Sequence, residues 1–450
     1  MNNTRDGASL KTALVRALLL GAGLISPIAC GGNVQPAVTE DVGVGPLRAY
    51  PPVVALKPAE LDPAGFWGAS GKGDGLWAST PTVSPEAAAG SLQAIGYAQG
   101  FEVLPVESGV FVRVADRIQP GPNLYVSGHG AEAILMATDG AVLHRWSHAY
   151  EALPNAPEAT EEQAGCWRRA AAREDGRLYA IHEGVGLVAL DRDSNLLWFH
   201  AGGEHHDLVL LDDGGLIVLA RAPRVVPEIH AEYPVLEDFV LWLDANGNEL
   251  RRISLLEAWR RSDFSDLLGQ RPYLVGDIMH TNGMSLLGSS LEARLPAFTE
   301  GNLLLSARML DAIFVLDPSS GRVVWAQRRP WLRQHDPSLT EAGTVLLFDN
   351  RGYRGASQVL EFDPAASREI WSYRGIPPQS FDSIFLGAAQ RLANGNTLIT
   401  EGCAGRALEV TPAGEVVWEF ISGHRAGEDG ELVAALFDVV RMPVGFGENW

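Results

Sequence analysis

Three histidines of this 450-residue chain share one distance from a glycine that marks a turn. His206, His280 and His335 each lie eight residues before such a glycine. An apolar segment follows directly in two cases, and after a longer insertion in the case of His280. Histidines in one phase of a repeated unit are expected at equivalent places in a fold, where a neutral imidazole can act as a nucleophile or a general base. The glycines are Gly214, Gly288 and Gly343.

The same count elsewhere in the chain ends on Arg113, Arg168 and Gly387. Counting seven residues past a turn glycine leads from Gly214 to Arg221 and from Gly301 to Arg308, each after an apolar strand. A ring of histidine and arginine predicts an anion site, because guanidinium groups match the oxygens of sulfate or phosphate. A lone histidine at a strand start is more often structural, so the shared phase is what favours function. The out-of-phase histidines are interpreted as surface or packing residues: His129, His144, His148, His182, His200, His230 and His424.

Further polar residues stand beside these positions. Asp207 and Asp336 each follow a ring histidine, and strand alternation turns them to the other side, which favours a structural hydrogen-bonding role. Asp349, Asn350 and Arg354 follow the strand after His335. Either they hold the loop beside that histidine or they touch the substrate, and the sequence leaves both roles open.

A repeated hairpin predicts the elements that must position these side chains. It consists of an apolar strand, an Asp or Gly turn, and a second strand that ends in tryptophan in five of six copies. A second hairpin with a turn glycine precedes each copy, so each repeat fits one four-stranded antiparallel sheet. Six such sheets repeated radially predict an all-β fold, a six-bladed β-propeller. The hairpins end at Trp146, Trp198, Ile253, Trp325, Trp371 and Trp418.

Composition excludes some classes of function. The chain has 49 glycines and 27 prolines, which is typical of many tight turns. Its formal net charge of −20 argues against nucleic acid as a partner, since phosphate binding needs a basic face. No Cys/His spacing resembles a zinc site, so no metal is predicted. Cys166 and Cys403 are interpreted as two buried thiols rather than a disulfide.

The N-terminus resembles a lipoprotein signal. Basic residues precede a short apolar run, and residues 27–30 resemble a lipobox that ends at Cys30, the predicted lipidation site. Gly31 after the cysteine is typical of lipoproteins passed on to the outer membrane. We therefore expect a periplasmic or outer-membrane lipoprotein in the cell envelope of a Gram-negative bacterium.

Three segments follow from this reading: a signal peptide over residues 1–30, a tether and lead-in segment over 31–100, and the propeller over 101–450. A short helix is expected from residue 84 to 95. An inserted helix is expected over residues 251–268. Residues 431–440 are expected either to close the ring or to form a terminal helix.

From about residue 120 to 420 the chain resembles the bacterial arylsulfotransferase family, the aryl-sulfate sulfotransferases that use no nucleotide sulfate donor (PAPS-independent). The three histidine motifs together with the arginine motif make the resemblance specific. The matching pieces are Gly128-His129-Gly130-Ala131-Glu132-Ala133, residues 139–146, His205-His206-Asp207, His280-Thr281-Asn282, Ser306-Ala307-Arg308, Gln334-His335-Asp336, Phe348-Asp349-Asn350 and residues 390–399.

The resemblance implies a six-bladed propeller that transfers a sulfuryl group from a phenolic sulfate ester to another phenol by ping-pong chemistry, with no cofactor. It places the nucleophile, which becomes a sulfohistidine, at His335 and the sulfate-clamping arginine at Arg308. Supporting histidines fall on His280 and His206, with His205 possible. The candidate substrate-binding residues are His205, Arg168, Arg221, Asn282, Asn350 and Arg354.

The expected partners are therefore a small phenolic sulfate donor and a phenolic acceptor, with membrane contact only through a lipid on Cys30. Two alternatives stay open. One is a non-catalytic propeller lipoprotein that only binds ligands. The other is a quinone-cofactor propeller, suggested by the hairpin over residues 317–325. That reading requires a calcium site, and the acidic cluster such a site needs is not evident in the sequence.

Overall fold

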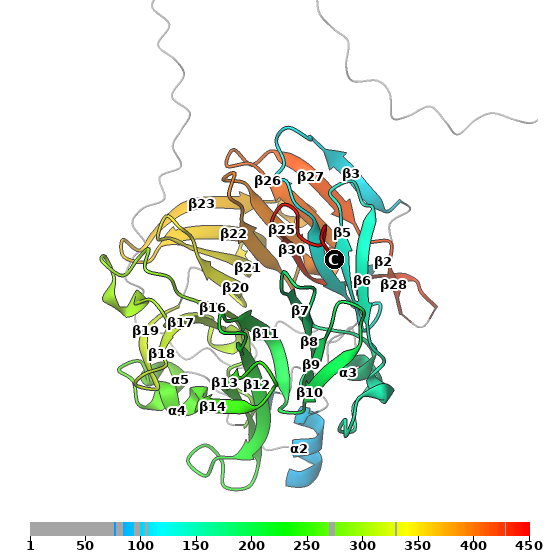
Figure 1. Cartoon of the computed structure of the whole chain (residues 1–450). Helices are drawn as coiled ribbons and strands as arrows, with labels where there is room; N and C mark the ends of the chain where they lie inside the picture. Colours follow the sequence, from blue (N-terminus) through cyan, green and yellow to red (C-terminus); the bar gives the residue numbers. More distant parts are fainter. Residues whose placement is uncertain are drawn as a thin grey trace, which may run out of the picture. The chain divides into compact units, whose positions relative to one another are not determined.

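The computed structural model describes residues 76–77, 84–93, 100–103, 107–269, 275–328, 331–427 and 429–450 (Figure 1). The chain divides into Met1–Gly45 and Pro46–Trp450, and every described residue belongs to the second unit. The expected signal segment and Cys30 lie outside the described residues. Strands dominate the described part, so the prediction of an all-β protein is confirmed.

Six sheets of at least four strands succeed one another along the described part of the chain. Sheet I comprises β30 (Leu436–Arg441), β4 (Asn123–Ser127), β5 (Glu132–Met136) and β6 (Val142–Ser147). Sheet II comprises β7 (Arg169–Ala172), β8 (Leu178–His182), β9 (Gly186–Leu190) and β10 (Leu196–His200). Sheet III comprises β11 (Glu204–Leu210), β12 (Leu216–Val225), β13 (Pro234–Leu243) and β14 (Glu249–Ser254), extended by β15 (Val275–Asp277) and β1 (Leu76–Trp77).

The next three sheets repeat the pattern. Sheet IV comprises β16 (Thr281–Leu286), β17 (Leu303–Ala307), β18 (Ala312–Asp317) and β19 (Arg322–Arg328). Sheet V comprises β20 (His335–Leu339), β21 (Val345–Tyr353), β22 (Ala356–Asp363) and β23 (Arg368–Arg374). Sheet VI comprises β24 (Ala388–Arg391), β25 (Thr397–Glu401), β26 (Arg406–Val410), β27 (Val416–Ile421) and β3 (Gly109–Arg113). A small seventh sheet pairs β2 (Gly100–Val103), β29 (Leu432–Ala434) and β28 (Arg425–Ala426).

Burial explains why these segments form stacked sheets. The second and third strands of sheet II are buried along their whole length, as are those of sheet IV apart from one terminal residue. Near-continuous apolar runs of this kind are expected when a sheet is covered on both faces. The fourth strands of sheets I and III are mostly exposed, and each has one buried residue near its end, as expected for an outer strand that meets solvent.

The repeated tryptophans join one sheet to the next. The indole Nε1 of Trp146, in sheet I, donates to the carbonyl of Gly176 in sheet II at 3.0 Å. Trp418, in sheet VI, donates to the carbonyl of Thr138 in sheet I at 2.8 Å. The succession of sheets therefore returns to its beginning. Equivalent bonds run from Trp198 to Ala245 and from Trp371 to Pro412.

The first strands of the sheets contact one another in the order β7, β11, β16, β20, β24 and β30, and β4 of sheet I contacts β7. In Figure 1, β7, β11, β16 and β20 lie inward of the fourth strands β14, β19 and β23. The closing strand is β30, so residues 431–440 contribute strands and not a terminal helix.

This closure corrects the position expected for Arg113. The residue lies on β3, which pairs with β27 at the outer edge of sheet VI, and its side chain bonds Thr138. The count of eight fails here because the chain enters through an outer strand and supplies the first strand of sheet I only at its C-terminus.

Helices among the described residues are few and short. α4 begins at Leu255, where Ser254 caps it by accepting the backbone N–H of Glu257 at 3.0 Å. The helix expected over residues 251–268 is thus divided: residues 251–254 complete β14, and two short helices follow. α2 contacts β12 and β13. No helix among the described residues has the length and apolar character needed to cross a membrane. The helices are α2 (Pro85–Gln93), α3 (Glu161–Gly165), α4 (Leu255–Arg260), α5 (Asp266–Gly269), η1 (Tyr150–Ala152), η2 (Pro296–Phe298), η3 (Arg308–Leu310), η4 (Pro378–Ser380) and η5 (Gly402–Ala404).

Candidate functional site

The two glycine offsets lead to one end of sheets II to V. Eight residues before the glycine lies the start of a first strand, and seven residues after it lies the end of a second strand. Because the two strands are antiparallel neighbours, these positions share an end of the sheet. The side chains brought there are all buried: Arg168, Glu183, His206, Arg221, His280, Arg308, His335 and Asn350.

The backbone is irregular where the histidines stand. The pairing registers of β11, β16 and β20 all shift within three or four residues of their first residue. His206 and His280 have φ angles of 55° and 51°, in the left-handed region. Such residues cost about 1–3 kcal/mol each and persist where their surroundings hold them. A carboxylate does so in both cases: Glu183 accepts the backbone N–H of His206 at 3.0 Å, and Asp277 accepts that of His280.

His335 is held in one tautomer. The amide nitrogen of Asn350 donates to the carbonyls of Ser383 and Leu386 at 2.5 and 3.0 Å, which turns its oxygen toward the histidine. That oxygen lies 2.7 Å from His335 Nδ1, so Nδ1 carries the proton and donates. His335 Nε2 therefore keeps its lone pair. It is buried, and no hydrogen-bond partner for it exists among the described residues.

The other three histidines form a connected group. The rings of His206 and His280 pack edge to face with centroids 4.9 Å apart. His205 Nδ1 lies 2.7 Å from His206 Nδ1, and His205 Nε2 points toward Asp238 at 3.7 Å. His206 is therefore the member of the pair that packs against His280. His280 Nδ1 lies 2.5 Å from Asp277 Oδ2.

Burial and nearby arginines keep these imidazoles neutral. Burial is the largest cause that lowers the pKa of His335 and of His280 well below the usual value, and Arg308 is the next. The pKa of His206 and that of His205 are lowered in the same way, first by burial and then by Arg168 and Arg221 respectively. The site thus presents neutral bases among fixed cations at neutral pH.

The guanidinium groups are held in different ways. Arg221 Nη2 lies 3.2 Å from Glu183 Oε1. Nη1 of Arg308 and Nη1 of Arg333 contact the same sulfur, that of Met309, at 3.4 and 3.0 Å. Two cations converging on one thioether create a positive region beside His280, whose pKa both of them lower. Such a region suits the oxygens of an anionic group.

Of the remaining predicted residues, Asn282 supports the backbone near His335 and Arg354 lies at the surface. Asn282 Nδ2 donates to the carbonyl of Gln334 at 2.9 Å and so holds the backbone before His335. Arg354 is exposed at the turn between β21 and β22, with its guanidinium over the ring of Tyr353. Of the two roles left open, Asn350 thus contacts His335 directly, and Arg354 has no contact with the site in the part of the chain that the structure describes.

The structure adds residues that the sequence reading missed. Glu183 stands seven residues after Gly176, so the offset that found Arg221 and Arg308 also points to it. Arg333 stands two residues before His335, but neither offset reaches it. Asp277 lies on β15, in the insertion between sheets III and IV, where the repeat phase is lost.

Residues 177–423 match the model of the arylsulfotransferase (ASST) family. This is more than half of the chain. The chain belongs to the arylsulfotransferase family. The predicted resemblance is thereby confirmed, and the sulfotransferase class of activity follows from the family at a general level.

Comparison with solved structures gives distant similarities to this family member. A protein of unknown function from Bacteroides caccae is 13% identical with a TM-score of 0.47, covering 71% of this chain and 98% of its own. A streptogramin B lyase is 11% identical with a TM-score of 0.42, covering 77% and 98%. The WD40 β-propeller domain of Doa1 is 10% identical with a TM-score of 0.40, covering 71% and 85%. A comparison with curated proteins gives no match.

One group of residues in this arylsulfotransferase family member has the composition of a metal site. Glu183, His205 and His206 each offer a ligand atom, and these atoms lie within 4.8 Å of one another. Arg221 already binds the carboxylate, and the two Nδ1 atoms already contact each other. The arrangement therefore suits proton sharing better than a divalent ion.

The hairpin that suggested a quinone cofactor begins at Asp317. The carboxylate of Asp317 accepts from Ser319 within its own turn, as a structural turn residue does.

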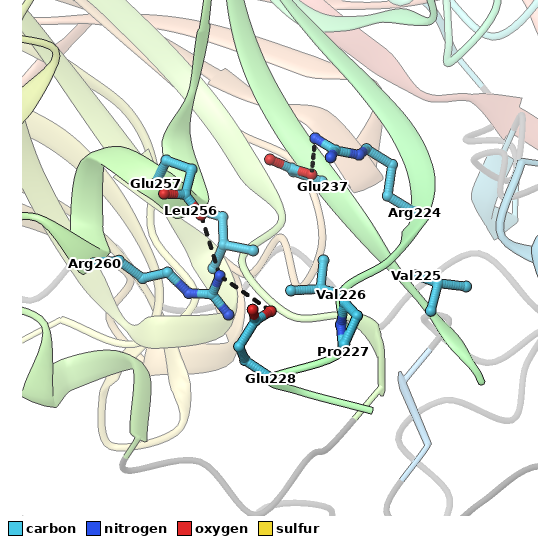
Figure 2. Close-up of a pocket in the computed structure, with 9 residues that line it drawn as sticks. All are labelled: Arg224, Val225, Val226, Pro227, Glu228, Glu237, Leu256, Glu257 and Arg260. Carbon is cyan, nitrogen blue, oxygen red and sulfur yellow. Dashed lines mark hydrogen bonds and ion pairs between the residues drawn. The ribbon is translucent and has the colours of Figure 1, made fainter. Parts of the chain in front are cut away.

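A separate pocket lies between the end of β12, β13 and α4 (Figure 2). Its volume is about 230 Å³. Figure 2 shows Arg224 paired with Glu237, and Arg260 with Glu257 and Glu228. Because both of its arginines already face carboxylates, this pocket is less suited to an anionic group than the histidine site.

Proposed function

We propose that this protein transfers a sulfuryl group from a phenolic sulfate ester to another phenol through a covalent intermediate on His335. The observation that carries the proposal is the bare, buried Nε2 of His335, with Nδ1 held by Asn350. An imidazole with a fixed lone pair, held neutral among cations, is suited to attack a sulfur that carries anionic oxygens.

In the first step, Nε2 of His335 forms a bond to the sulfur and the bond from sulfur to the phenolic oxygen breaks. The bond electrons leave with the phenolate. Arg308 is placed to stabilise the sulfuryl oxygens, because its guanidinium is buried and close enough to lower the pKa of His335.

In the second step, the oxygen of the acceptor phenol attacks the same sulfur. The bond from sulfur to Nε2 breaks, its electrons return to His335, and the phenolic proton passes to a neighbouring base. A covalent intermediate divides one difficult displacement between two weak nucleophiles into two easier ones. Neither step requires a nucleotide donor or a cofactor.

The architecture proposed for this chemistry is a six-bladed β-propeller, with sheets I to VI as blades. It is supported by the closed succession of first strands and by the tryptophan bonds between sheets. The lipid anchor at Cys30 and a place in the cell envelope of a Gram-negative bacterium, periplasmic or at the outer membrane, remain part of the proposal, on the strength of the N-terminal sequence alone.

The test is the intact mass of the purified protein after brief exposure to 4-nitrophenyl sulfate. We expect a gain of about 80 Da, the mass of SO₃, which disappears when phenol is added. His335→Ala should show no gain. If neither an adduct nor nitrophenol appears with this donor and a panel of other sulfate esters, transfer is refuted and the site only binds.

A further inference from the structure

The proton of the acceptor phenol needs a base, and three site histidines besides His335 are available. Asp277 contacts one of them, His280. It is fully buried on β15, which adds to sheet III by parallel pairing with β13. Its Oδ2 lies 2.5 Å from His280 Nδ1, and the same carboxylate accepts the backbone N–H of His280. The backbone and the ring of His280 are thus held by one residue.

The group that bonds Nδ1 differs between His335 and His280, and this difference suits the two histidines to different roles. His335 bonds a neutral amide, and His280 bonds a carboxylate. A carboxylate accepts a hydrogen bond from Nδ1–H, which keeps the proton on Nδ1 and leaves Nε2 basic. It also stabilises the imidazolium that forms when Nε2 gains a proton, which a neutral amide does much less. His335 is therefore suited to be the nucleophile, and His280 to carry the proton.

His206 is less suited to that role. Its Nδ1 lies 3.3 Å from Glu183 Oε1, an oxygen that Arg221 also contacts at 3.2 Å. Glu183 Oε1 is thus shared between His206 and a guanidinium at more than 3 Å from each, whereas Asp277 Oδ2 lies 2.5 Å from His280 Nδ1. His280 is also the most exposed of the four histidines, at 6% against 2% for His206 and 1% for His205 and His335.

We propose that Asp277 is a positioning residue that makes His280 the base for the acceptor phenol. This inference rests on the proposed function. In the second step the phenolic proton moves to His280 Nε2, the phenolic oxygen bonds the sulfur, and the bond from sulfur to His335 Nε2 breaks. The cations around His280 are Arg308, Arg221, Arg333 and Arg168, which disfavour its protonated form, so the proton then leaves to solvent or to the phenolate released in the next first step.

The experiment separates the two half-reactions in the full protein. Asp277→Asn is nearly isosteric, but its amide can donate to Nδ1 and so favours the wrong tautomer of His280. With 4-nitrophenyl sulfate, whose leaving group needs no proton, we expect adduct formation within about threefold of the unsubstituted protein. Discharge by phenol at neutral pH should slow about 100-fold or more, and the loss should shrink for acidic phenols that are already ionised.

Asp438→Asn is the matched control, since it also removes a buried carboxylate but touches none of the site histidines. It should leave both half-reactions unchanged. Asp277→Glu should recover part of the discharge rate. His280→Ala should reproduce the Asp277→Asn phenotype, and the double variant should lose little more, because both substitutions remove one function.

The outcomes are distinguishable. If the unsubstituted protein forms no adduct, the proposed function itself fails. If it forms the adduct and Asp277→Asn discharges it at the normal rate for all phenols, the role of Asp277 is refuted. An equal loss in both half-reactions, or a loss independent of phenol acidity, would make Asp277 a structural residue and refute the inference as well.

Discussion

Two clusters built from consecutive residues of the same strands have opposite characters. Arg168 faces the histidines, whereas its neighbour Arg169 binds three carboxylates. Arg169 Nε lies 3.0 Å from Asp207, Nη1 lies 2.8 Å from Asp438, and Nη2 lies 3.5 Å from Asp336. Asp207 and Asp336 follow His206 and His335, so each strand contributes one residue to each cluster.

The difference lies in how charge is paired. In the Arg169 cluster the carboxylates come from β11, β20 and β30, so one guanidinium joins three first strands. In the histidine site, neutral imidazoles stand among several cations, and the reactive nitrogen of His335 has no hydrogen-bond partner among the residues that the structure describes. Polar groups that are satisfied by one another stabilise a fold, and groups left unsatisfied are available to a substrate. The interpretation of Asp207 and Asp336 as structural residues agrees with this arrangement.

The largest effect on activity is expected from a substitution in the histidine site. His335→Ala should lower the rate of sulfuryl transfer on the order of 10⁴-fold or more, because the nucleophile is removed. The free energy of unfolding should fall by only about 1–3 kcal/mol, from the cavity and from the loss of the donor to Asn350. Steady-state transfer and chemical denaturation measure the two quantities. A large loss of stability with residual transfer would reverse the roles assigned to the clusters.

The second effect is expected on the structural side. Arg169→Met should lower the free energy of unfolding by about 3–5 kcal/mol, because it leaves three carboxylates without their cation. The activity per folded molecule should fall far less than in His335→Ala. Arg173→Met is the control. Arg173 directly follows β7, and its guanidinium donates to the carbonyls of Leu211 and Gly215, with no carboxylate among its described contacts.

The loss in Arg169→Met should also depend on pH. Burial raises the pKa of Asp438 to about 6 and also raises that of Asp207. A carboxyl with a raised pKa contributes stability that is present at low pH and lost as pH rises through that value. Denaturation at pH 5 should therefore show a smaller deficit than at pH 7.5, and an equal deficit at both would contradict this account.

The third effect is expected from loss of the hydrogen bond that fixes the tautomer of His335. Asn350→Ala removes the acceptor of Nδ1–H and should slow adduct formation about 10–100-fold, as loss of an orienting partner does. Part of the adduct should then form on Nδ1, which nitrogen-15 NMR of the sulfated protein can distinguish from Nε2. Asn246→Ala, at an exposed turn, should leave the rate unchanged. An unchanged rate in Asn350→Ala would show that the tautomer is set elsewhere.

The sequence indicated candidate site residues where its repeats are periodic and missed others where the periodicity is lost. Equal offsets from turn glycines recur because each sheet places its turns and strand ends in the same register, and these offsets reach His335 and Arg308. Arg113 was misplaced because ring closure joins a strand near the N-terminus to sheet VI and the C-terminal strand to sheet I, a pairing with no local signal. Asp277 was missed because it lies in an insertion.

Side-chain pairing is the part that periodicity cannot supply. Arg168 and Arg169 have the same chemistry in the sequence, and only the carboxylates that three distant strands bring to Arg169 separate their roles. The repeat likewise marks the tryptophans, but not that the indoles of Trp198 and Trp371 are only half-buried and bond the turn of the following sheet. Both facts depend on contacts between sheets.

The smallest effect concerns the acid limit of the reaction. Neutral His335 is the reactive form, so adduct formation is lost as pH falls through its pKa. Burial and then Arg308 lower that pKa well below the usual value, and the rate should stay level from pH 8 to below pH 6.5. Arg308→Gln removes a cation that disfavours the imidazolium, so the pKa rises and activity is lost at a higher pH. Single-turnover adduct formation across pH measures the limit, independently of the lower maximal rate that this variant should also have. If its acid limit coincided with that of the unsubstituted protein, burial alone would account for the neutrality of His335, and the cations would serve the sulfuryl oxygens only.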